Sequence, residues 1–155
     1  MKQVIVWSVI VGSLLSGCSS SAPKCADSDA KALVLDISTK ALRDKLVGKY
    51  MFEYASLRAN FSYDRLTEII EQGAGEDKSG YSEYTINELK SVKARVDKRF
   101  EEEIFLETIR TDSKDETLKK SLCSAVLRFG TKEIPIRYKL EMTSEDELYA
   151  TVYGL

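Results

Sequence analysis

The sequence predicts an α+β domain, with amphipathic helices first and a four-stranded antiparallel meander after them. Apolar residues repeat every three or four positions between residues 27 and 100, which is the spacing of one helix face. From residue 104 to residue 153 apolar and polar residues alternate, and short polar segments interrupt the alternation, as in consecutive strands joined by turns. Helices that precede a run of neighbouring strands are expected to pack on one face of the sheet.

The first amphipathic helix is predicted over Asp27–Val47. Asp27 and Asp29 suit its first turn, where carboxylates bind free backbone amides and meet the positive end of the helix dipole. Gly48 is a natural stop for this helix. The apolar stripe of the helix consists of Ala30, Leu33, Val34, Ile37, Ala41, Leu42 and Leu46.

Residues 48–63 support two interpretations. Tyr50, Phe52 and Tyr54 alternate as in a strand, whereas Tyr50, Tyr54 and Leu57 repeat at the spacing of a helix. The periodicity does not decide between the two.

Two further helices are predicted before residue 104. Asp64–Gln72 is predicted to be a short helix that ends at the flexible loop Gly73–Gly80. The segment Thr85–Glu88 has the spacing of a capping box, in which the first and fourth side chains bind backbone amides, and it is predicted to open the next helix. The apolar stripe of that helix consists of Ile86, Leu89, Val92, Val96 and Phe100.

The four strands of the meander are predicted from the alternation of apolar and polar residues. The third strand has one apolar and one polar face, and Pro135 within it indicates an edge position or a strand start, because proline cannot donate a ladder hydrogen bond. The strands are Ile104–Thr111, Leu118–Phe129, Ile134–Met142 and Leu148–Tyr153, with polar turns at 112–116 and 144–146.

The composition excludes several classes of function. The chain has no histidine and three cysteines, so a histidine general base, a histidine-rich zinc site and a four-cysteine zinc site are all excluded. With 23 basic and 25 acidic residues the formal charge is −2, which gives no general attraction to nucleic acid. The remaining carboxylates, serines and lysines show no catalytic spacing, and we expect a non-catalytic chain without a metal or cofactor.

Residues 1–17 have the pattern of a secretory signal. A short basic opening, Met1-Lys2-Gln3, precedes a largely apolar run from Val4 to Leu15. Twelve residues form about 18 Å of helix, which is too short for the roughly 30 Å of hydrocarbon in a bilayer. The segment is therefore predicted to direct export rather than to span a membrane permanently.

The run ends in Leu15-Ser16-Gly17-Cys18, which resembles the lipobox of bacterial lipoproteins. This resemblance implies cleavage after Gly17, a diacylglyceryl group on the Cys18 sulfur and acylation of the new amine. Two or more acyl chains anchor a protein stably, so the mature chain is expected to be fixed to a membrane. Ser19 at the second mature position matches sorting to the outer membrane, on its periplasmic side. In a host with one membrane, the same anchor leaves the domain on the outer face of the cytoplasmic membrane.

With Cys18 assigned to the lipid, Cys25 and Cys123 remain in an oxidising compartment, and they are predicted to form a disulfide. Residues 18–24 are predicted to be the lipidated anchor and a short tether of at most about 20 Å. Residues 25–155 are then expected to form one globular domain close to the membrane. The strand segments also resemble those of small uncharacterised secreted lipoproteins, a likeness that implies no activity.

These expectations favour a binding or adaptor module at the cell envelope, whose partner is an envelope protein. The alternative is an envelope-protection lipoprotein, encoded by a mobile element, that excludes, inhibits or confers immunity; a cell-wall-active enzyme is a third and weaker interpretation. Tyrosine offers rigid amphipathic contact area, so the partner surface is predicted at Tyr50, Tyr54, Tyr81 and Tyr84. The sheet edge near Pro135 is a second candidate, through strand addition.

Basic residues crowd the helix that follows the capping box. Their simplest interpretation is a solvated helix face, and the alternative is contact with anionic lipid headgroups or an acidic partner. These residues are Lys90, Lys93, Arg95, Lys98 and Arg99.

Overall fold

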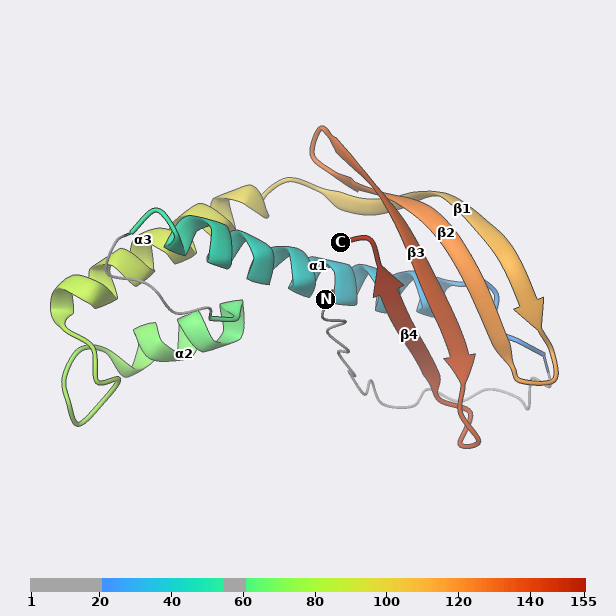
Figure 1. Ribbon diagram of the computed structural model, residues 1–155, viewed down its shortest axis with the longest axis horizontal. Coiled ribbons are helices and arrows are strands. Elements are labelled where there is room, and N and C mark those ends of the chain that lie inside the picture. The colour runs from blue at the N-terminus through green and yellow to red at the C-terminus, as the bar shows by residue number, and fades with distance from the viewer. Residues whose placement is uncertain (1–20, 55–60) are drawn as a thin grey trace. The chain divides into compact units, whose positions relative to one another are not determined.

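Three helices precede a four-stranded antiparallel sheet in the computed structural model, which describes residues 21–54 and 61–155 (Figure 1). This is the α+β order that the sequence predicts. The signal segment, the lipobox with Cys18, and residues 55–60 lie outside the described residues. The elements are α1 (Ser28–Met51), α2 (Tyr63–Gln72), α3 (Glu83–Arg99), β1 (Ile104–Asp115), β2 (Lys120–Phe129), β3 (Lys132–Met142) and β4 (Leu148–Tyr153).

The described residues divide into two compact units. The sheet unit comprises residues 21–38 and 104–155, and the helical unit comprises residues 39–103. Helix α1 contributes its first part to the sheet unit and its second part to the helical unit. The prediction that residues 25–155 form one domain stays a prediction.

The sheet of the first unit has the strand order β1-β2-β3-β4, and each strand is antiparallel to its neighbour. Burial alternates along β2 and β3, so one face is buried and the other is exposed to solvent. The first turns of α1 run across one face of the sheet in Figure 1, and Ala30 and Val34 are buried there. The buried strand residues are Cys123, Ala125, Leu127, Phe129, Ile136, Tyr138 and Leu140.

Strand β1 is longer than predicted, and its pairing with β2 shifts register twice, between Glu107 and Arg110 and between Thr111 and Ser113; we call the first shift the β1 bulge. Glu107 pairs with Val126 and Arg110 pairs with Ser124, so two residues of β1 oppose one residue of β2. The predicted turn at 112–116 is wrong, because the strand continues through Asp115. The chain turns afterwards, and the Asp115 carboxylate accepts a hydrogen bond from the Leu118 amide at 2.9 Å.

The segment before α1 is attached to the sheet unit. Cys25 and Cys123 form a disulfide with an S–S distance of 2.02 Å, which is the predicted pairing. The Ala22 amide donates to the Glu116 carboxylate at 2.6 Å, and the Ser121 hydroxyl donates to the Pro23 carbonyl oxygen at 2.6 Å. Ala22 and Pro23, which belong to the predicted tether, therefore lie against β2 and the turn that precedes it.

Helix α1 does not stop at Gly48, so the predicted end is wrong. The helix continues to Met51, and the Gly48 carbonyl oxygen accepts a hydrogen bond from the Phe52 amide at 3.2 Å. Val47 and Met51 are fully buried one turn apart, and their burial against α2 and α3 favours continued helix over a glycine stop. Of the undecided segment 48–63, the structure thus assigns residues 48–51 to α1 and Tyr63 to α2.

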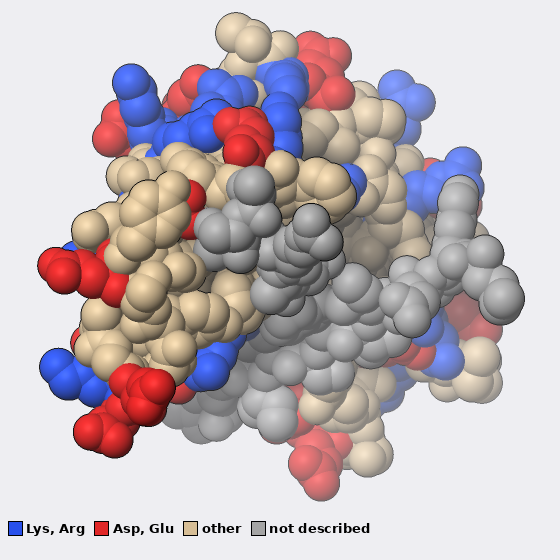
Figure 2. Space-filling view, turned by 60° about the vertical axis from the view of Figure 1, so that its left-hand side comes forward, with Lys and Arg blue, Asp and Glu red and all other residues tan. Residues whose placement is uncertain are grey.

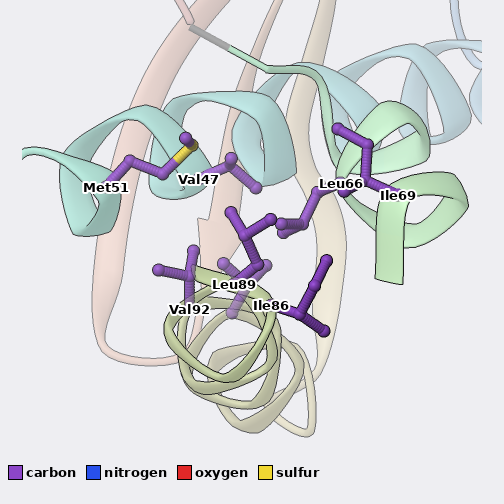
Figure 3. Close-up of a cluster of buried hydrophobic side chains, with 8 residues drawn as sticks. Val47, Met51, Leu66, Ile69, Ile86, Leu89 and Val92 are labelled. Atoms are coloured by element: carbon purple, nitrogen blue, oxygen red, sulfur yellow. The ribbon is translucent and has the colours of Figure 1, made fainter. Parts of the chain in front are cut away.

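The apolar faces of α2 and α3 meet the end of α1 in the core of the helical unit (Figure 3). Helix α2 ends at the Gly73 cap, as predicted, while α3 starts earlier than the predicted capping box at Thr85. The Ser82 hydroxyl is the N-cap, accepting the Thr85 amide at 3.2 Å. The core consists of Val47, Met51, Leu66, Ile69, Ile86, Leu89, Val92 and Val96.

Candidate binding surfaces

The described residues contain no cluster of side chains that could hold a metal ion. Within residues 21–54 and 61–155, no group of three or more carboxylate or cysteine side chains could hold a metal ion. Both cysteines of this part of the chain are in the disulfide. Among the same residues, no helix has the length and apolarity needed to span a bilayer.

Two of the four tyrosines proposed for partner binding, Tyr50 and Tyr54, contact Arg95 of α3. The Arg95 guanidinium lies 4.1 Å from the centre of the Tyr50 ring and forms an ion pair with Glu53. The hydrogen bond that Arg95 donates to the Glu53 carboxylate, with smaller contributions from Tyr54 and Tyr50, raises the pKa of Arg95. The same contact with Arg95 lowers the pKa of Glu53. Arg95 therefore fixes the end of α1 against α3 through charge and ring stacking.

Tyr84 lies in the first turn of α3 and extends this cluster into solvent, because its side chain is 69% exposed. Its pKa is raised by the hydrogen bond and negative charge of Glu88, with a small contribution from Tyr54. Phe52, directly after α1, is 94% exposed. We call Tyr50, Phe52, Tyr54 and Tyr84, with Arg95, the aromatic surface.

Figure 2 shows the face that lies on the left in Figure 1. Uncharged side chains on this face lie between groups of acidic and basic side chains. An uncharged region with a charged border is the usual composition of a protein interface. Contiguous apolar patches on a protein surface, unlike singly exposed apolar side chains, often mark interaction sites.

Tyr81, the fourth proposed tyrosine, is partly buried against the helical core, as Tyr50 and Tyr54 are. Its ring packs edge to face against Phe61, with 6.3 Å between ring centres. Tyr63 is also partly buried, and its hydroxyl donates to the Asp97 carboxylate. The structure thus brings Tyr50 and Tyr54 to Arg95 and packs Tyr81 against Phe61, while Tyr84 is the exposed member of the four.

The basic residues of α3 are largely engaged within the chain. Lys93 pairs with Asp97 at 2.7 Å, and Arg99 pairs with Glu102 at 2.6 Å. The hydrogen bond to Asp97 raises the pKa of Lys93. With Arg95 bound to Glu53, these pairs favour the solvated-face interpretation over a lipid-binding helix.

The outer face of the sheet contains a hollow that the sequence analysis did not anticipate. Its volume is about 520 Å³, and it is open to solvent. Each outward position looks ordinary in the sequence, and only the strand register brings these residues to one place. The lining residues come from all four strands and the chain end: Thr108, Arg110, Ser124, Ala125, Val126, Pro135, Ile136, Arg137, Tyr153 and Gly154.

Pro135 lies near the start of β3, in agreement with one of its two predicted positions. Strand β3 is an inner strand, but β4 pairs with it only from Arg137 onward, so no β4 residue pairs with Pro135. The backbone at Gly154 approaches closely here, because a Cβ atom on Gly154 would lie 2.9 Å from the Pro135 carbonyl oxygen. This approach limits the room for strand addition beside Pro135.

Comparison with known proteins adds no family to this geometry. No protein-family model matches the chain, and no curated protein or solved structure is significantly similar to it.

Proposed function

We propose that the mature chain is a lipid-anchored, non-catalytic binding module of the bacterial envelope, and that its aromatic surface holds a partner protein. The observation that carries the proposal is the contact of Tyr50 and Tyr54 with Arg95, together with the exposed side chains of Tyr84 and Phe52 in the same helical unit. Aromatic and arginine side chains dominate the binding energy of protein interfaces.

The first described residues support an anchor that keeps the sheet unit near the membrane. Ala22 is buried and bound to Glu116, so only Ser19–Ser21 separate the expected lipid on Cys18 from the folded chain. The four Cα-to-Cα steps from Cys18 to Ala22 can therefore span at most about 14 Å. A partner on or in the same membrane is therefore within reach, while one across the periplasm is not.

The aromatic surface also suits binding because much of it is already rigid. Tyr50 lies within α1 and is stacked by Arg95, and Arg95 is in turn held by two hydrogen bonds to Glu53. Side chains ordered before binding lose less conformational entropy when the partner docks. Phe52 is the exposed apolar group that would insert into the partner.

Site-specific photo-crosslinking in intact cells tests the partner surface. A photoreactive residue at Phe52 or Tyr84 is expected to capture the same envelope protein, identified by mass spectrometry. The same probe at Thr131, an exposed residue in the turn between β2 and β3, is the control and should not capture it. Equal capture at all three positions, or none at Phe52 and Tyr84, would contradict the proposal.

Two matched substitutions test the energetic contribution of Phe52. Phe52→Ser should weaken partner binding at least about tenfold, because an exposed aromatic anchor is lost. Leu118→Ser removes another exposed apolar side chain, in the turn between β1 and β2, and should leave binding unchanged. If the two variants bind alike, the aromatic surface is not the partner site.

The anchor has its own test. Cys18→Ser should abolish incorporation of labelled palmitate and leave the uncleaved precursor, because the sulfur is the atom expected to take the lipid. Normal cleavage together with unchanged membrane fractionation of this variant would refute the lipoprotein assignment.

A further inference from the structure

A row of four side chains crosses the outer face of the sheet. Arg110 of β1 pairs with Ser124 of β2, Ser124 pairs with Arg137 of β3, and Arg137 pairs with Tyr153 of β4. The two arginines lie two strands apart, so their backbones are separated by about 10 Å. Both long side chains can therefore approach one small group held above Ser124.

The β1 bulge creates this row. If pairing continued from Glu107 and Val126 without interruption, Arg110 would lie opposite Cys123, whose side chain points to the buried face. The extra residue shifts the register and places Arg110 opposite Ser124 on the outer face. Thr108 in the bulge has φ of 52°, an uncommon conformation for threonine, and it lines the hollow.

The two arginines differ from the other cations of this face. Arg128 is bound to Glu107 at 2.9 Å and Glu133 at 2.6 Å, and Lys139 is bound to Glu141 at 2.7 Å. Neither Arg110 nor Arg137 has an ion-pair partner in the part of the chain that the structure describes. The hollow thus carries positive charge that the described chain does not neutralise by pairing.

The other groups around the hollow determine which further parts of a ligand could bind there. Asp112 accepts a hydrogen bond from the Ser124 hydroxyl at 2.9 Å, so one negative charge lies beside the two positive ones. Val126 and Pro135 add apolar surface, and the half-exposed Tyr153 forms one side. The volume of about 520 Å³ is in the range of small-molecule sites.

We propose that this hollow binds a phosphate monoester that carries a flat apolar group. Guanidinium groups form paired hydrogen bonds with phosphate oxygens, and two of them approaching from opposite sides match a tetrahedral group better than a planar carboxylate. The apolar part of the ligand would lie over Val126 and Pro135 beside Tyr153. This site belongs to the sheet unit, and it requires neither the lipid anchor nor the aromatic surface.

Calorimetric titration of the purified chain with phenyl phosphate, at low salt and constant pH, tests the proposal. We expect binding of one phenyl phosphate per chain, weakened at least about tenfold by Arg110→Gln and by Arg137→Gln. Arg110→Lys and Arg137→Lys keep the charge but lose the paired hydrogen bonds, so they should weaken binding to a smaller extent. All four changes are at exposed positions, and thermal unfolding would verify that each variant folds.

Two control variants distinguish a specific binding site from general electrostatic attraction of the phosphate to the chain. Lys98→Gln, at an exposed position of α3, changes the net charge by the same amount as the arginine variants and should leave binding unchanged. Asp112→Asn removes the neighbouring negative charge but keeps an oxygen for Ser124, so it should tighten binding about threefold.

The proposal is overturned if phenyl phosphate does not bind at about 10 mM, or if neither glutamine variant weakens it. Benzoate bound as tightly as phenyl phosphate would show that the site does not select phosphate. Inorganic phosphate bound as tightly as phenyl phosphate would show that the apolar surface of the hollow contributes nothing to the affinity. Because Phe52→Ser should not affect this titration, failure here and failure of the partner surface are distinguishable.

Discussion

The hydroxyl of Tyr138 joins the N-terminal segment to the sheet. It donates a hydrogen bond to the Cys25 carbonyl oxygen at 2.9 Å, and the side chain is only 1% exposed. Burial, with a smaller contribution from Asp112, raises the pKa of Tyr138 to about 12. The folded chain therefore keeps a phenol proton that the unfolded chain releases near pH 10.

This difference predicts a loss of stability in alkaline solution. Between pH 10 and about 12 the unfolded state binds fewer protons, so the free energy of unfolding should fall by about 1.4 kcal/mol per pH unit. Tyr138→Phe should remove this slope and cost about 1 kcal/mol at neutral pH through the lost hydrogen bond. Urea unfolding of the parent chain and of the Tyr138→Phe variant at several pH values measures this slope. Parallel alkaline losses in the two chains would contradict the assignment to Tyr138.

At the scale of elements, the ends of helices depend on local hydrogen bonds and on burial. The Ser82 hydroxyl caps α3, and the Gly73 amide donates to the Ile69 carbonyl oxygen at the end of α2. The Gly48 prediction fails because burial of Met51 stabilises another turn of helix α1. A glycine inside a helix costs only about 1 kcal/mol, less than a buried methionine contributes.

The cap of α3 can be tested directly. Ser82→Ala should lower the free energy of unfolding by about 1 kcal/mol, because the Thr85 amide loses its acceptor. Ser82→Asp keeps an acceptor at the same place and should be close to the parent chain. Urea midpoints of the two variants and the parent give the comparison, and equal losses in both variants would show that the hydroxyl is not the cap.

At the scale of the whole chain, the disulfide links the segment before α1 to β2 across a sequence separation of 98 residues. A cross-link that closes so long a loop restricts the unfolded chain strongly. The hydrogen bonds of Ala22 to Glu116, in the turn before β2, and of Pro23 to Ser121 of β2 hold the N-terminal segment beside the cross-link.

Removal of the disulfide should therefore be costly. Replacing Cys25 and Cys123 together by alanine is expected to lower the free energy of unfolding by about 4.7 kcal/mol in the chain-entropy model, because the closed loop spans about 100 residues. Unfolding of the parent chain with and without reductant should show the same loss, and reductant should not affect the double variant. A double variant as stable as the oxidised parent would contradict this role.

Much of the fold can be predicted from local pattern. The stripe from Ile86 to Val96 and the alternation from Ile134 to Met142 correspond to buried faces, since periodicity directly reflects which side of an element meets the core. The ends of elements were less predictable, as Gly48 and Thr85 show. There, competing hydrogen-bond acceptors and the burial of single residues decide the boundary.

The candidate surfaces were predictable only in part. Tyrosine abundance pointed to the region of Tyr50, Tyr54 and Tyr84, but the contact of Tyr50 and Tyr54 with Arg95 depends on the tertiary structure, since Arg95 reads in the sequence only as part of a basic helix. Tyr81 has the same composition signal and, like Tyr50 and Tyr54, is partly buried against the core, whereas Tyr84 is exposed. Residue type alone cannot separate a packed ring from a presented one, because both uses bury much of the aromatic surface.

The sequence by itself determined the order of helices and strands, the exclusion of histidine chemistry and, given the lipobox resemblance, the pairing of Cys25 with Cys123. Only the tertiary structure decided that Arg110 and Arg137 flank Ser124. The physical reason is the period of two in a strand. One extra residue in the β1 bulge moves Arg110 to the opposite face, and no local pattern specifies where that residue is inserted.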